Sequence, residues 1–340
     1  MGLNIEDFDY DLPKALIAQY PEEDREASRL LVFNRAEETI AHRSFRDIIE
    51  YLNKGDVLVL NDSKVLPARL RGRKDTGGAV DILLVERINE ARWLCLAKGI
   101  KAGARDQKVS VGPIEAQLTK GEDYWVIDFR HDGDVTDIMR QYGRMPLPPY
   151  IKRKDGNGTI DDERYQTVYA EMFGSIAAPT AGFHFSEDLL EAIKRKGVQV
   201  VKITLHIGVG TFFLIKKRNV QDHHMYGEYY HITPEAKSFI RKAKDEGRRI
   251  IACGTSAVRT LETVYSENDK PLAGKTDLFV YPGYRFKMVD AMITNFHLPR
   301  STPLLLVSAL AGFDRIRKCY KEAMEKGYRF YSYGDAMLIL

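Results

Sequence analysis

Two histidines, each beside glycine and threonine, mark the part of the chain best suited to chemistry. His184 stands in PTAGFHF, before an expected helix, and His206 stands in TLHIGVGTF, after an expected strand at 198–205. The helix is predicted from Ser186 as its N-cap, from the acidic residues that follow, and from Gly197 at its end. Ligands of α/β proteins bind where such turns meet the carboxyl ends of strands. We therefore expect a polar site at these two turns.

A second strand–turn–helix unit offers a place for an anion. The pattern predicts a strand at 249–252, a turn at 253–256 and a helix at 257–265. Backbone amides at a helix start receive carboxylates or phosphates, although the GxxxxGK[ST] pattern of a P-loop is absent. A third histidine, His297, follows Asn295 in TNFHLPRST. One such histidine is more often structural than catalytic, but three at element junctions favour a shared polar pocket.

Other motifs argue against a metal or a dinucleotide. His223, His224, Glu228 and His231 match neither HExxH nor any cysteine-containing zinc pattern. The two glycines at 208–210 lack the third glycine of a dinucleotide fingerprint. The three cysteines are widely spaced and form no CxxC pair. We expect no metal and no bound cofactor.

Two shorter polar motifs leave a structural and a ligand-binding interpretation open. The expected strand at 56–60 ends in Asn-Asp-Ser at 61–63, a turn that either holds a ligand or merely ends the strand. Arg25 and Arg29 flank Ser28 just before another expected strand. These two arginines either form a surface salt bridge or contact an anion.

Composition describes an ordinary globular chain. It has 340 residues, of which 44% are hydrophobic and 29% charged, with a net charge of +3. No run of about eighteen apolar residues is present and the first residues are acidic, so we expect a cytoplasmic protein without membrane segments. Basic clusters occur at 152–154, 194–196, 216–218 and 241–249. They form either a phosphate-binding patch or solvated helix ends, and charge alone favours the second interpretation.

Element spacing predicts two domains. Short strand-like runs separated by glycine and charged turns fill the region 67–146, which indicates a small inserted antiparallel β-barrel. The flanking parts, 1–66 and 147–340, alternate strands and helices and predict an α/β main domain with a mixed or parallel sheet. A strand is also expected at 278–286, broken by its Pro-Gly pair. No repeat or heptad seam is visible, so we expect a monomer.

Taken together, the motifs resemble the S-adenosylmethionine:tRNA ribosyltransferase-isomerase family of queuosine biosynthesis. The resemblance runs nearly end to end, through DYDLPKALIAQYP, GDVLVLNDSKVLPARL, GRMPLPPYIKR, SIAAPTAGFHF, TLHIGVGTF, GTSAVRTLE, ITNFHLPRSTPLLLVSALAG and YRFYSYGDAML. One departure concerns Tyr226, which stands where the family usually has a second histidine. Asp81, where the family often has glutamate, is a milder change.

The resemblance implies an unusual reaction. S-adenosylmethionine, a consumed co-substrate, donates its ribosyl part to the aminomethyl group of 7-aminomethyl-7-deazaguanine at the wobble position of a tRNA with a GUN anticodon. Adenine and methionine leave, and epoxyqueuosine-tRNA is formed. Such chemistry needs a base for the proton on the ribose carbon next to the sulfonium and an acid for adenine. It needs no metal or redox cofactor.

Residue roles follow from the resemblance as hypotheses. His184 and His206 are candidates for proton transfer, with Glu228 or His223 orienting them or sharing the task. Ribose or adenine is expected at Thr180, Thr204 and Thr211; the methionine carboxylate at Gly254, Thr255, Ser256 and Arg259; the deazaguanine at Asn295, His297 and Asp335; and base stacking at Tyr284. The expected contacts to tRNA phosphates are Lys152, Arg153, Lys154, Lys216, Lys217 and Arg218.

Two other functions are consistent with a polar pocket. A nucleoside hydrolase would release adenine from S-adenosylmethionine without tRNA. An RNA-binding module would bind tRNA without turnover.

Overall fold

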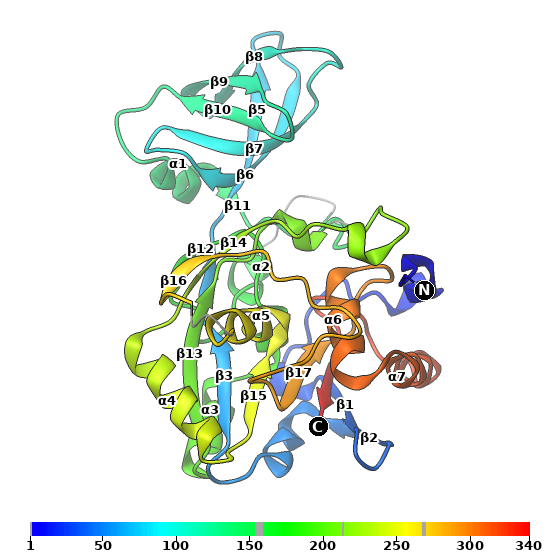
Figure 1. Cartoon of the computed structure of the whole chain (residues 1–340). Coiled ribbons are helices and arrows are strands. Elements are labelled where there is room, and N and C mark those ends of the chain that lie inside the picture. Colours follow the sequence, from blue (N-terminus) through cyan, green and yellow to red (C-terminus); the bar gives the residue numbers. More distant parts are fainter. Residues whose placement is uncertain (1, 154–158, 213, 267–269) are drawn as a thin grey trace. The chain divides into compact units, whose positions relative to one another are not determined.

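The computed structural model describes residues 2–153, 159–212, 214–266 and 270–340. They form two compact units (Figure 1), one made of 1–64, 149–152 and 164–340 and the other of 65–148 and 153–163. The second unit thus extends beyond the expected insert, because it also takes in 153–163. There Arg153 forms a buried ion pair with Asp161, at 2.7 Å. No described helix is long and apolar enough to span a membrane.

A nine-stranded mixed sheet is the core of the first unit. In spatial order its strands are β16 (Ala273–Thr276), β14 (Glu228–His231), β13 (Gln199–Leu205), β3 (Val57–Asn61), β15 (Ile250–Cys253), β17 (Ala291–Asn295), β18 (Ala336–Ile339), β1 (Arg29–Asn34) and β2 (Thr39–Ser44). The four central strands, β13, β3, β15 and β17, are parallel. Three of them, β3, β15 and β17, are buried along their whole length, which explains why their sequences are apolar except at the carboxyl ends of β3 and β17.

Helices pack on both faces of this sheet. One face carries α4 (Pro234–Asp245), α5 (Gly254–Val264), α6 (Thr302–Ala311) and α7 (Phe313–Glu325). The other carries α3 (Glu187–Arg195) and the 3-10 helices Phe45–Tyr51 and Thr180–His184. Side chains of β3 alternate between the two cores, since Val57 and Val59 belong to the first and Leu58 and Leu60 to the second. The α/β expectation is confirmed.

The second unit contains the predicted antiparallel barrel. Six strands close it in the order β5 (Arg69–Lys74), β6 (Ala79–Arg87), β7 (Arg92–Lys98), β10 (Trp125–Phe129), β9 (Ile114–Lys120) and β8 (Asp106–Val111), because β8 pairs back with β5. The short strand β11 (Gly143–Arg144) pairs with the first residues of β5, and α1 (Val135–Tyr142) packs its apolar side on the barrel core. The helix α2 (Thr159–Arg164) follows.

Shorter elements complete the first unit. The two-stranded ladder of β4 (Ser63–Val65) and β12 (Met172–Ser175) starts directly after the central strand β3. Single-turn 3-10 helices span Ile5–Phe8, Lys14–Leu16, Arg25–Ala27, Val209–Phe212 and Val220–Asp222.

The prediction of a strand at 278–286 is wrong. Residues 278–286 contain no strand, and the backbone N–H groups of Lys287, Met288 and Val289, just beyond them, donate to the buried carboxylate of Glu262. A side chain of α5 therefore fixes the end of this segment in place of a neighbouring strand.

Candidate active site

The carboxyl ends of the four parallel strands form one edge, and two pockets lie there. β3 ends at Asn61, β13 at Leu205, β15 at Cys253 and β17 at Asn295. Parallel strands bring their following turns together, so segments far apart in sequence meet at this edge. Of the two turns at which the sequence predicts the site, the one with His206 follows β13 at this edge.

The first pocket, here the polar pocket, is lined by hydroxyl, amide and imidazole groups. Thr180, Asn295, His297, Tyr331 and Ser332 contribute polar side chains to it. The second, the apolar pocket, is lined by Leu278, Phe279 and Leu306 together with His223, Tyr226 and Glu228.

The two pockets share a wall. Ile207, Thr255, Ser256 and Pro303 line both of them. Thr255 and Ser256 lie in the first turn of α5, which starts at Gly254, so the turn expected at 253–256 is already helical. Its backbone amides and hydroxyls therefore stand between the pockets, where a helix start favours an anion. We treat the pockets as two halves of one site.

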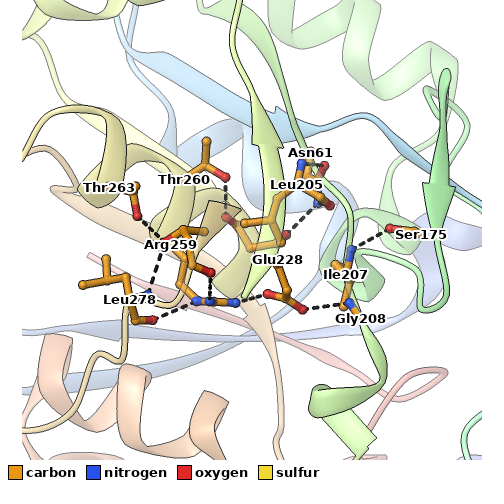
Figure 2. Close-up of polar contacts among 12 residues, drawn as sticks. Asn61, Ser175, Leu205, Ile207, Gly208, Glu228, Arg259, Thr260, Thr263 and Leu278 are labelled. Carbon is orange, nitrogen blue, oxygen red and sulfur yellow. Dashed lines mark hydrogen bonds and ion pairs between the residues drawn. The ribbon is translucent and has the colours of Figure 1, made fainter. Parts of the chain in front are cut away.

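Asn61 holds the edge together (Figure 2). Its side-chain amide donates to the Leu205 carbonyl and to Ser256 Oγ, both at 3.0 Å, and its Oδ1 accepts from the backbone of Leu205 and Ser63. The residue is fully buried. It joins the ends of β3 and β13 to the start of α5. Of the two interpretations of this turn, the structure supports a scaffold role for Asn61.

Glu228 and Arg259 form a buried ion pair that fixes the wall of the apolar pocket (Figure 2). Each is 7% exposed. Glu228 Oε1 accepts from the Gly208 amide at 2.8 Å, and Arg259 donates to the carbonyls of Leu278 and Thr276 at 3.0 and 3.1 Å. The guanidinium is thus engaged by protein groups, and Arg259 also lines the apolar pocket, so its role at the methionine carboxylate stays a prediction. Glu228 likewise positions the turn after β13.

His184 lies behind the polar pocket. It is 4% exposed, with Nδ1 at 2.7 Å from Ser28 Oγ and Nε2 at 3.2 Å from Asn295 Nδ2. Because the amide nitrogen donates, we assign Nε2 as acceptor and Nδ1 as the protonated nitrogen that donates to Ser28. Burial, and secondly Arg329 and Arg25, lower the pKa of His184 to about 3. Both ring nitrogens of His184 are thus engaged by protein groups, and one of them orients Asn295. Its role in proton transfer stays a prediction.

The neutral state of His184 predicts a pH-dependent stability. In the unfolded chain the pKa of His184 is about 6.5. As the pH falls below that value, the unfolded state therefore binds a proton that the folded state does not bind. Protonation of His184 in the unfolded chain therefore lowers the free energy of unfolding, by about 2 kcal/mol between pH 6.5 and pH 5. We expect the difference in unfolding free energy between the wild type and His184→Gln to shrink by that amount. Urea titrations at pH 7 and pH 5 measure it, and a constant difference would contradict the assignment.

His206 lies beside the pockets without lining them. Its Nδ1 is 2.7 Å from Ser63 Oγ, and its ring stacks on Tyr229 with centroids 5.9 Å apart. A Cβ atom on Gly174 would lie 2.6 Å from His206 Nε2, so only glycine fits there. Burial lowers the pKa of His206. The ring is enclosed between Gly174 and Tyr229 and lines neither pocket, so its expected role in proton transfer stays a prediction.

Two other histidines do face the pockets. His297 lines the polar pocket, with Nε2 at 2.7 Å from Thr294 Oγ1. His223 lines the apolar pocket and packs edge-on against Phe279, with centroids 5.2 Å apart. Burial, and secondly His224, lower the pKa of His223. No side-chain hydrogen bond engages the His223 ring among the described residues. Of the four residues expected to transfer protons, it is the best placed.

Three expected substrate contacts lie elsewhere. Thr204 donates to the buried Asp62 at 2.7 Å, Tyr284 donates to Glu262 at 3.2 Å, and Asp335 accepts from the backbone of Arg29 and Arg329. None of the three lines either pocket. The side chain of Thr211 lies outside the described residues.

The basic clusters differ in their surroundings. Arg153 forms its buried ion pair with Asp161, whereas Lys152 is exposed. Their expected contacts with tRNA stay predictions. Lys154 lies outside the described residues. Lys216, Lys217 and Arg218 are exposed. Their segment is tied to the pocket rim, because Ile215 donates to the Arg300 carbonyl and the next residue, Ser301, lines the polar pocket.

Comparison with known proteins assigns the family. The family model described as queuosine biosynthesis protein matches residues 5–339. Proteins named S-adenosylmethionine:tRNA ribosyltransferase-isomerase, from Symbiobacterium thermophilum and Thermotoga maritima, are 49% and 48% identical over 99% of this chain and their full length. A crystal structure of S-adenosylmethionine tRNA ribosyltransferase from Thermotoga maritima aligns with a TM-score of 0.58 and 39% identity, over 98% of this chain and all of that one. The chain belongs to the queuosine biosynthesis protein family.

Proposed function

We propose that this protein transfers and isomerises the ribosyl part of S-adenosylmethionine onto the aminomethyl group of 7-aminomethyl-7-deazaguanine at the tRNA wobble position. The products are epoxyqueuosine-tRNA, adenine and methionine. The full-length match to relatives named for this activity supports the proposal. The observation that carries it is the site divided in two by the start of α5, since the reaction brings together two different bases and one anionic amino acid.

The chemistry of each pocket suggests what it binds. The apolar pocket, with Phe279 and Leu306, suits the flat face of adenine. The polar pocket, with Asn295 and Thr180, suits the hydrogen-bonding edge of the deazaguanine. The amides and hydroxyls at the start of α5 lie between them, where they suit the methionine carboxylate.

His223 is the residue that we assign to proton transfer. A neutral imidazole in the apolar pocket is a proton acceptor, and the proton to be removed lies on the ribose carbon next to the positive sulfonium. Loss of that proton leads to expulsion of adenine, which takes up a proton as it leaves. The aminomethyl nitrogen then attacks the ribosyl part, and closure of the epoxide breaks the bond to sulfur and releases methionine. The sequence moves protons and one ribosyl group, so we propose no metal or redox cofactor.

The tRNA substrate has a GUN anticodon, and its wobble nucleotide must leave the stack to reach the polar pocket. Lys152 and the segment Lys216–Arg218 are placed on the surface as phosphate contacts. We also propose that the protein works as a monomer. We further propose that it acts in the cytoplasm, where tRNA is available.

A labelling experiment tests the proposed function. Purified protein is incubated with tRNA carrying the aminomethyl-deazaguanine and with S-adenosylmethionine labelled either in the ribose or in the methyl group. We expect the ribose label in the tRNA nucleoside, at the mass of epoxyqueuosine, and the methyl label in free methionine. Methyl label in the tRNA would instead identify a methyltransferase and overturn the proposal.

A further inference from the structure

Three arginines gather at a small pocket that the proposed reaction leaves unused. Arg25, Arg164 and Arg329 line it together with Ser28 and His184. Glu22 is the one carboxylate among its lining residues within the described parts of the chain. Three guanidinium groups and one carboxylate therefore line the pocket, so its lining is rich in positively charged side chains.

Backbone carbonyls help to orient two of these arginines. Arg25 donates to the carbonyls of Phe183 and Gln166 at 3.0 and 3.1 Å. Arg164 donates to the carbonyls of Glu23 and Glu22 at 3.0 and 2.7 Å. Backbone carbonyls orient a guanidinium without cancelling its charge.

Arg329 completes the set. It lies 2.8 Å from the Glu22 carboxylate and also donates to the Tyr20 carbonyl. The buried carboxylate of Asp335 also lies within electrostatic reach of Arg329. The three guanidinium groups are thus held by protein partners before any ligand arrives, which lowers the entropy cost of binding an anion.

The arginine pocket adjoins the polar pocket. Ser332 lines both. His184 lines the arginine pocket and is hydrogen-bonded to Asn295, which lines the polar pocket. A nucleotide whose base enters the polar pocket therefore carries its backbone close to the three arginines.

We propose that the arginine pocket binds a backbone phosphate of the substrate RNA, at or next to the nucleotide that is modified. Arginine forks match the oxygens of a phosphate, and phosphate contacts fix the register of a nucleic acid on a protein. The proposal rests on the proposed function and adds a positioning subsite to it. The sequence left open whether Arg25 forms a surface salt bridge or contacts an anion, and this proposal favours the anion contact. Arg29 turns away, with its guanidinium 3.8 Å above the Tyr328 ring.

Binding of RNA to single substitutions tests the subsite. Arg25→Gln and Arg329→Gln are titrated with a fluorescent anticodon stem-loop RNA, and Arg43→Gln, at an exposed position outside the pocket, controls for the loss of one charge. We expect each pocket variant to raise Kd by about tenfold and to lower the slope of log K against log salt by about 0.7, the value for one phosphate on a single strand. The affinity for S-adenosylmethionine is expected to stay unchanged. An RNA affinity equal to that of Arg43→Gln would overturn the proposal.

A change in the RNA separates a phosphate contact from a structural role. Single phosphates of the loop are replaced by uncharged methylphosphonates and each RNA is titrated against the wild type and Arg329→Gln. We expect one position at which the methylphosphonate lowers the RNA affinity of the wild type but leaves the RNA affinity of Arg329→Gln unchanged. Equal losses in both proteins at every position would show that Arg329 only supports the fold, and would overturn the proposal. Because binding is measured without turnover, the outcome is independent of the labelling experiment.

Discussion

Glu228→Gln is expected to lower the free energy of unfolding by about 3–5 kcal/mol, because removing one partner of a buried ion pair leaves the other charge without compensation. Arg259 is 7% exposed, and its remaining partners are the neutral carbonyls of Leu278 and Thr276. The segment at 276–280 and the turn after β13 both lose their anchor. We therefore expect a melting temperature lower by about 10 °C and a strong loss of activity. Thermal unfolding followed by circular dichroism measures the first effect.

Two controls isolate the buried pair. Glu191→Gln removes an exposed partner of Lys194, and we expect it to leave the unfolding free energy nearly unchanged. The double variant Glu228→Gln with Arg259→Met removes both charges and is expected to recover most of the lost stability. Equal destabilisation by the buried and the exposed substitution would show that the pair does not hold the site.

His223→Gln is expected to lower kcat by about 10²–10⁴-fold, the usual contribution of a general base. The side chain is only partly buried and no side-chain hydrogen bond engages its ring among the described residues, so we expect the melting temperature to stay unchanged. His224→Gln is the matched control, since His224 is the exposed neighbour and lines neither pocket. Single-turnover rates of adenine formation measure the effect. A rate within threefold of the wild type would remove His223 from the reaction.

The pH dependence of the same variant gives a second test. A base acts in its neutral form, and the pKa of His223 lies below the ordinary value of about 6.5 because of burial. Wild-type kcat/KM should therefore stay constant as pH falls to about 6.5 and decline only at lower pH. His223→Gln should lose that decline while its rate stays low. If kcat/KM of the variant still declines at low pH, the decline is due to the protonation of another group.

Much of the fold was predictable because its local signals agree with its packing. The helix α3 begins after Ser186, whose side chain accepts from the Leu189 amide, as the cap residue predicts. The barrel strand β6 alternates buried and exposed residues, with Val80, Ile82 and Leu84 inward, which gives the period-two pattern that predicted it. The prediction of a strand at 278–286 was wrong because the end of this segment is held by Glu262, a side chain on another element that no local pattern reveals.

The location of the site was predictable, and the roles within it were less so. Polar residues at strand ends pointed to the edge where Ser256 and Asn295 do line the pocket. Residue type alone does not show whether a side chain is already committed. Arg259 looked free to bind a carboxylate, yet its partner Glu228 lies 31 residues earlier in the chain. His184 and His206 stood out by their motifs, whereas the structure places His223 in a pocket.

The most direct test of the central claim is the dependence of adenine release on the RNA. Protein and S-adenosylmethionine are mixed with tRNA that carries the aminomethyl-deazaguanine, with the same tRNA carrying guanine, and without tRNA. The account predicts one adenine for each modified nucleoside formed in the first mixture, and none in the other two. Adenine released without tRNA would identify a nucleoside hydrolase. Tight binding of the modified tRNA with no adenine would identify a binding module, and either result would contradict the account.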